Sequence, residues 1–112
     1  MYISKLLVLF ISICSCFANA GAWENRRSSL EKVAVYGEFR VFYSLSGKDS
    51  LPKSRRVDSN HNKIPDFIDS IGKRLIDSNN FFKYEVGLKP PLMSKRYRGQ
   101  VHYIDVNVLD FS

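Results

Sequence analysis

The chain has 112 residues and a formal net charge of +6, from 17 Lys and Arg against 11 Asp and Glu. Its basic residues lie in short scattered groups, which favours solvated faces over a nucleic-acid groove. These groups are Arg26-Arg27, Arg55-Arg56, Lys73-Arg74 and Lys95-Arg96-Tyr97-Arg98. Length and charge therefore predict one small basic domain without a nucleic-acid partner, whose charge allows at most a loose preference for an anionic envelope or polymer.

Residues 1–20 have the pattern of a secretory signal peptide. One positive charge precedes an apolar run, residues 6–14, which is too short to serve as a permanent membrane span. Ala18 and Ala20 then form the A-x-A pattern of a cleavage site. The mature protein is expected to be secreted or periplasmic after cleavage behind Ala20.

Both cysteines, Cys14 and Cys16, lie inside this segment, so the mature chain is expected to have no disulfide. A small exported domain without disulfides needs its core, a partner or a bound ion for stability. A minor alternative is a lipoprotein, because residues 13–16 loosely resemble a lipobox with Cys16 as the acylated residue. The cysteine usage thus makes a bound ion worth seeking.

The first predicted strand follows a polar segment. Residues 21–32 are mixed in composition and predict a linker or a short helix. Residues 33–45 are rich in β-branched and aromatic side chains, and apolar residues alternate with polar ones from residue 39 onward. This pattern predicts one strand, or a hairpin bent at Gly37. Residues 46–57, rich in Gly, Ser, Pro and charge, predict a loop.

Residues 64–84 have the spacing of an amphipathic helix, with apolar side chains at steps of three and four. Pro65 fits its first turn, where no backbone donor is needed, and the helix should end by Gly87 because Pro90-Pro91 cannot continue it. The predicted buried face consists of Ile64, Phe67, Ile68, Ile71, Leu75 and Phe82.

A terminal strand is expected at residues 101–109, with His102, Ile104, Val106 and Val108 on one face. The order strand, loop, helix, strand predicts a small α+β domain over residues 33–112. Its core is thin, and nothing follows the last strand to cover the sheet. We therefore expect an incomplete domain, either a truncated copy of a longer protein or a domain that needs a partner.

The stretch 58–69 carries oxygen-bearing side chains at positions 1, 3, 5, 9 and 12 of a twelve-residue window. This is the spacing of a calcium loop, in which alternate residues point their oxygens at one hard ion. The sequence therefore predicts a structural calcium site. Its candidate ligands are Asp58, Asn60, Asn62, the carbonyl of Ile64, and Asp66 or Asp69.

Two departures separate this loop from an EF-hand. Lys63 stands at position 6, where glycine usually makes the sharp turn, and Asp69 stands at position 12 in place of glutamate. No helix is predicted before the loop, and two neutral Asn ligands predict a weak site, with a dissociation constant of about 10⁻⁴–10⁻³ M. The alternative is that Asp and Asn form turns and cap the helix. His61 and His102 are not at metal-pair spacing.

Four segments together resemble a known family. In the order of the chain they are EFRVFYSLSGKDSLP, VDSNHNKIPDFIDSIGKRL, NNFFKYEVGLKPPL and VHYIDV. From Glu38 to Asp105 they are similar to the N-terminal part of a family of bacterial secreted zinc metalloproteases. The most specific element is residues 62–67, in which Lys63 replaces the family's glycine. The resemblance implies an H-E-x-x-H zinc motif downstream, and this chain contains none.

No protease activity is therefore expected of this chain, and it carries no other motif of an enzyme class. The first hypothesis is an exported, noncatalytic domain or fragment of such a metalloprotease, stabilised by calcium. Its partner would be a missing C-terminal catalytic part or an envelope protein. The second is a stand-alone envelope or extracellular interaction module, and the third is a binder of anionic polymers.

Overall fold

The computed structural model describes residues 24–112. The predicted signal peptide lies outside the described residues, together with Cys14, Cys16 and the cleavage site at Ala18 and Ala20. Within residues 24–112, no helix is both long enough and apolar enough to cross a membrane.

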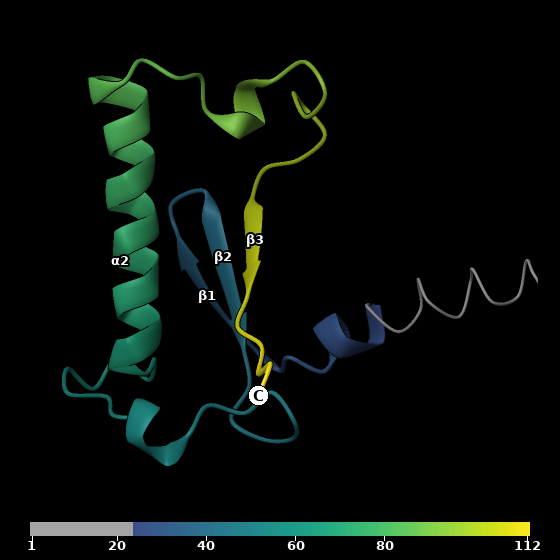
Figure 1. The fold of residues 1–112 in the computed structure, drawn as a ribbon, viewed down its shortest axis with the longest axis vertical. Helices are drawn as coiled ribbons and strands as arrows, with labels where there is room; N and C mark the ends of the chain where they lie inside the picture. Colours follow the sequence, from purple (N-terminus) through teal and green to yellow (C-terminus); the bar gives the residue numbers. More distant parts are fainter. Residues whose placement is uncertain (1–23) are drawn as a thin grey trace, which may run out of the picture.

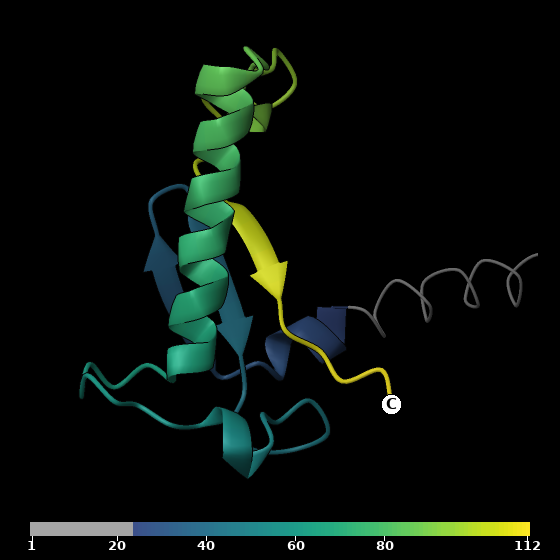
Figure 2. The ribbon, with the colours of Figure 1, turned by 60° about the vertical axis from the view of Figure 1, so that its left-hand side comes forward.

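In the described residues, a three-stranded sheet and one long helix make up the fold (Figures 1 and 2), which confirms the predicted α+β class. The strands are β1 (Lys32–Tyr36), β2 (Phe39–Tyr43) and β3 (Ile104–Asn107), in the order β1-β2-β3. β1 pairs with β2 antiparallel, and β2 pairs with β3 parallel. The parallel pair requires a crossover, and helix α2 (Asp66–Asn80) lies in that connection and packs against β1 and β2.

Of the two interpretations of residues 33–45, the hairpin is the one observed. Gly37 has φ +57° at the turn between β1 and β2, a conformation that glycine adopts without a steric penalty. The predicted alternation holds in β2, where Phe39, Val41 and Tyr43 are buried and the residues between them are half-buried. Of the two interpretations of residues 21–32, a linker or a short helix, the described part contains the short helix, at residues 24–28.

The core lies between α2 and the sheet. Ile68 of α2 is fully buried, as is Val41 at the centre of β2. Ala34, Tyr43 and Leu51 complete the buried cluster. The partly buried apolar side chains around it are Tyr36, Leu45, Ile64, Phe67, Ile71, Leu75, Val106 and Val108. Five of the six residues of the predicted helical face therefore pack against or within the core.

The sixth, Phe82, was predicted wrongly, because it is half exposed. The α-helix ends at Asn80 and continues as a π-helical turn, η2 (Phe81–Glu85). A π-turn has a wider spacing than 3.6 residues, so the side chains in it leave the face that the α-helical period defines. Gly87, with φ +75°, ends this segment, and the N–H of Leu88 donates to the carbonyl of Phe82 at 2.9 Å.

Three predicted boundaries also need correction. Pro65 precedes α2 instead of lying in its first turn, since its ψ of 139° is extended. The loop over residues 46–57 includes a short 3-10 helix, η1 (Lys53–Arg55). The terminal strand is limited to β3, because successive turns occupy residues 94–100, and His102 lies outside the strand and is exposed.

At Gly72, α2 lies very close to the Tyr36 ring of β1. A Cβ built on Gly72 would lie 2.3 Å from two ring carbons of Tyr36. The ring cannot move aside freely, because its hydroxyl donates to the Oδ1 of Asp69 at 2.6 Å. Only glycine therefore allows the helix to lie at this distance from the strand.

Gly72→Ala should accordingly destabilise the fold, although alanine is the better helix former. We expect a loss of about 1–3 kcal/mol in the free energy of unfolding, measured with urea. Ser70→Ala, at an exposed position of the same helix, is the matched control and should stay within about 0.5 kcal/mol. A Gly72→Ala variant as stable as the control would contradict the close packing.

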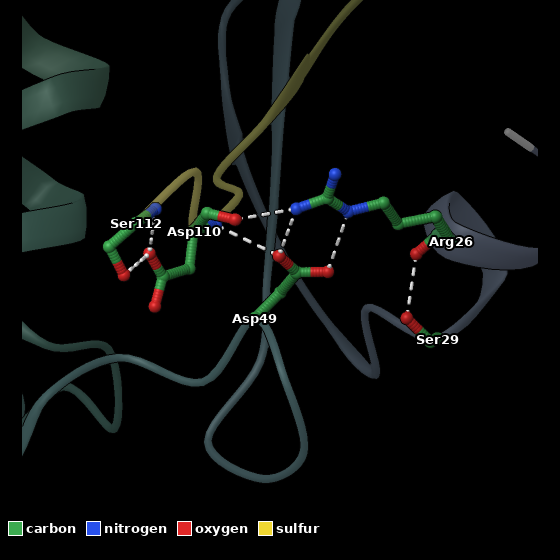
Figure 3. Close-up of polar contacts among 5 residues, drawn as sticks. All are labelled: Arg26, Ser29, Asp49, Asp110 and Ser112. Atoms are coloured by element: carbon green, nitrogen blue, oxygen red, sulfur yellow. Dashed lines mark hydrogen bonds and ion pairs between the residues drawn. The ribbon is translucent and has the colours of Figure 1, made fainter.

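An ion-pair cluster joins three segments that are distant in the sequence (Figure 3). The guanidinium of Arg26 donates to both carboxylate oxygens of Asp49, at 2.8 and 3.1 Å. The same guanidinium donates to the carbonyl of Asp110 at 2.6 Å, and the N–H of Asp110 donates to Asp49 at 2.8 Å. The cluster thus ties helical residues 24–28 and the C-terminal residues to the loop after β2.

These donors lower the pKa of Asp49 from 3.8 to about 2, with Arg26 as the main cause. Because the pKa is lower in the folded state, the stabilisation is complete above pH 4 and is lost as the pH falls through about 2. Urea unfolding should therefore show the wild type more stable than Asp49→Asn at neutral pH, with the difference shrinking between about pH 4 and pH 2.

Ser70→Ala, at an exposed position of α2, serves as the control, because it changes no titratable group. Its difference from the wild type should stay nearly constant over the same pH range. A constant difference for Asp49→Asn as well would mean that the ion pair does not stabilise the fold.

Candidate functional site

The loop between η1 and α2 holds the residues that the sequence marks as cation ligands. It lies at the end of α2 opposite to the one from which the chain runs on to β3 (Figures 1 and 2). Two of its residues, His61 with φ 56° and Lys63 with φ 68°, have left-handed backbone conformations. The N–H of Asp66 donates to the carbonyl of Val57 at 2.7 Å, which closes the loop at its base.

The side chains at positions 1, 3 and 5 fold inward onto the loop's own backbone. The carboxylate of Asp58 accepts the N–H of Asn62 at 3.2 Å and the N–H of Lys63 at 2.8 Å. The Oδ1 of Asn60 also accepts the N–H of Asn62 at 3.2 Å. The Oδ1 of Asn62 accepts the N–H of Ile64 at 2.8 Å. Each of these oxygens has further acceptor capacity for a second partner.

Asp69, at position 12, joins this group from the first turn of α2. Its Oδ2 accepts the side-chain amide of Asn62 at 2.7 Å, and its Oδ1 accepts the hydroxyl of Tyr36 at 2.6 Å. The pKa of Asp69 lies below its ordinary value, chiefly because Tyr36 donates to it, with smaller contributions from the amides of Asn62 and Asn60. Partial burial acts in the opposite direction. Asp69 thus carries its negative charge into the loop.

The hydrogen bond between Tyr36 and Asp69 also affects the pKa of Tyr36. Its pKa is raised, first by burial and then by the hydrogen bond to Asp69, so the hydroxyl stays protonated and remains a donor. The sequence pattern does not predict this contact, because nothing local links the end of β1 to a carboxylate 33 residues away. In β1 the buried Ala34 and the half-buried Tyr36 alternate with exposed valines, and this alternation brings Tyr36 to the helix side.

Asp66, at position 9, has a different partner. Its carboxylate accepts the backbone N–H of Ser59 at 3.0 Å and the hydroxyl of Ser59 at 2.5 Å. It therefore closes the first turn of the loop, a role that the sequence pattern also left unpredicted. Of the predicted side-chain ligands, the structure brings Asp58, Asn60, Asn62 and Asp69 into one hydrogen-bonded group and turns Asp66 toward Ser59.

The donor set is one of hard oxygens, from two carboxylates and two amides. Within residues 24–112, no three His, Cys, Asp or Glu side chains lie close enough together to hold a metal ion. Calcium also accepts amide and carbonyl oxygens, so the chemistry of the loop fits a weakly bound calcium ion. Binding would require Asn62 to release its amide hydrogen bond to Asp69.

Comparison with known proteins gives no relative for this chain. No family model matches it, and no curated protein or solved structure matches it.

Lys63 is strained at a position where calcium loops usually have glycine. A left-handed conformation costs a residue with a side chain about 1–2 kcal/mol, whereas the flexibility of glycine in the unfolded chain costs about 0.5–1 kcal/mol. Lys63→Gly should therefore raise the free energy of unfolding by about 0.5–1 kcal/mol, measured with urea. Lys53→Gly, in η1 where φ is not positive, is the control and should lower stability. A loss of stability in Lys63→Gly would rule out relief of strain.

Proposed function

We propose that this chain is an exported, noncatalytic domain related to the N-terminal part of secreted zinc metalloproteases, in which the loop 58–69 binds calcium as a structural ion. Export is supported by the signal-peptide pattern of residues 1–20. The relationship is supported by the order of the motifs from Glu38 to Asp105. Its noncatalytic character is supported by a sequence without H-E-x-x-H, in which both histidines are exposed.

One observation carries the calcium part of the proposal. The oxygens at positions 1, 3 and 5 are already held on backbone N–H groups, while Lys63 takes the left-handed turn that glycine makes in calcium loops. Simple helix capping does not require this path, because a cap needs one side-chain acceptor near the first turn of the helix. In α2 the residue before the helix is Pro65, which makes no side-chain cap.

A bound calcium ion would supply positive charge between Asp58 and Asp69. The contacts of Asp69 determine which part of the fold this charge would stabilise. Asp69 is hydrogen-bonded to Tyr36 of β1, and its backbone belongs to α2, so fixing the loop fixes the junction of the strand and the helix. The ion would act as a disulfide does in other small exported domains, by adding a constraint that the thin core lacks.

Thermal unfolding with calcium and with chelator tests this proposal. At about 10 mM calcium, which is about tenfold above the upper expected dissociation constant, binding should add about 1.4 kcal/mol to the stability. The midpoint should therefore rise by about 5–10 °C over its value in chelator. Asp58→Ala should be less stable in both conditions, because it loses two hydrogen bonds to the backbone, and should lose the calcium-dependent rise.

Asp77→Ala is the matched control, since it removes an exposed carboxylate of α2 that lies outside the loop. It should keep the full calcium-dependent rise. The same concentration of magnesium should give a smaller rise, because magnesium demands a more rigid octahedral set of ligands. If calcium does not move the midpoint of the wild type, or moves Asp58→Ala equally, the loop is held by its hydrogen bonds alone.

A further inference from the structure

The end of the molecule opposite to the loop presents a large apolar surface to solvent. The chain leaves α2 here through η2 and then forms a short 3-10 helix, η3 (Pro91–Met93), before it reaches β3 (Figure 1). Six large apolar side chains in this stretch are each 50 to 69% exposed. We call them the helix-end surface: Phe81, Phe82, Tyr84, Val86, Leu88 and Met93.

Two adjoining apolar hollows continue this surface toward the sheet. The larger has a volume of about 480 Å³ and extends from Phe82 and Leu88 to Phe39 and Ile104. The smaller, of about 320 Å³, is lined by Tyr97 and other apolar side chains. Both hollows include Pro91 and Ile104, so they form one apolar region. An apolar area of this kind on a small domain marks an interaction site.

The segment that carries the apolar region is also rich in basic side chains. Residues 81–98 contain five basic residues against the single acidic residue Glu85, and all six are exposed. Lys83 and Lys89 line the larger hollow. The ammonium of Lys83 lies 5.1 Å from the centre of the Tyr84 ring. The other basic residues are Lys95, Arg96 and Arg98.

The excess of positive charge favours one kind of partner over the others that could cover the helix-end surface. A second copy of the chain is disfavoured, because the excess of basic residues on each copy would face the same excess on the other. A soluble anionic polymer would use the charge but would leave the apolar side chains in water. A bilayer with anionic lipids satisfies both, since aromatic rings insert at the level of the headgroups while lysine and arginine stay beside the phosphates.

We propose that the helix-end surface binds peripherally to bilayers that contain anionic phospholipids. Phe81, Tyr84 and Met93 would enter the headgroup region, and Lys83 and Lys89 would contact the lipid phosphates. The loop 58–69 lies at the other end of α2, so this binding does not depend on calcium in the loop (Figures 1 and 2). The proposal goes beyond the structural role of the calcium loop and can fail independently of it.

The test measures cosedimentation of the exported chain with vesicles in the presence of chelator, which removes any contribution of calcium. Vesicles of phosphatidylglycerol mixed with phosphatidylcholine are compared with vesicles of phosphatidylcholine alone. Binding should be strong only to the mixed vesicles and should fall with added salt. Lys83→Gln/Lys89→Gln should weaken binding about 25-fold, at about fivefold for each charge. Phe81→Ser/Tyr84→Ser should weaken it at least about tenfold.

Two controls isolate the surface. Lys48→Gln/Lys53→Gln removes two exposed charges from the opposite end of the molecule, and Phe111→Ser removes an exposed aromatic ring near the C-terminus. Both should bind like the wild type. All variants share the same N-terminal residues, whose processing is checked by intact mass, so binding through that segment would not respond to these substitutions. Unchanged thermal midpoints confirm that the variants are folded.

Three outcomes would overturn the proposal. The first is equal binding to both kinds of vesicle, or none to either. The second is a loss of vesicle binding in Lys48→Gln/Lys53→Gln as large as that in Lys83→Gln/Lys89→Gln. Binding would then depend on the total charge of the protein and not on the position of the lysines. The third is self-association without vesicles that Phe81→Ser/Tyr84→Ser abolishes, which would make a second copy the partner.

Discussion

Tyr36 is the side chain on which the rest of the structure depends. Its ring lies against the backbone of α2 at Gly72, and its hydroxyl donates to Asp69 on the next turn toward the start of the helix. One residue at the end of β1 therefore sets both the distance between sheet and helix and the position of the carboxylate that faces the loop. Ile68 lies on α2 beside Asp69 and is fully buried, so the polar contact and the core are formed by consecutive residues.

In this arrangement, the polar side chains at the loop end of the molecule already have hydrogen-bond partners within the protein. The oxygens of Asp58, Asn60 and Asn62 accept backbone N–H groups of the same loop, and Asp66 closes its first turn. Throughout the part of the chain that the structure describes, no buried side-chain nitrogen or oxygen lacks a partner. An ion at this loop would displace the amide hydrogen bond from Asn62 to Asp69, and its contribution is reduced by the loss of that bond. This reduction is consistent with weak binding.

Local periodicity predicted the elements of the fold. The way in which these elements pack depends on side-chain contacts between distant segments. The alternation of β2 and the three- and four-residue steps of α2 are fixed by neighbouring residues, so both could be predicted. Phe82 was assigned wrongly because the change to a π-turn after Asn80 breaks the period without any proline or glycine at that point. The contacts Tyr36–Asp69 and Arg26–Asp49 span 33 and 23 residues, and no local pattern encodes them. For the site, the spacing predicted which loop to consider, but only the structure separates Asp66 from the other candidate ligands.

The two ends of α2 differ in the kind of side chain that could still gain contacts from a partner. At the loop end, polar groups meet one another, and a hard ion could add only a modest increment. At the other end, the helix widens into η2, and Phe82, which was expected to continue its buried face, is half exposed and lines a hollow together with Lys83 and Lys89. Apolar area exposed to water opposes stability at about 25 cal/mol for each Å², so it contributes favourably only when something covers it. In a domain with so small a core, this uncovered end has more free energy to gain from a partner than the polar loop has to gain from an ion.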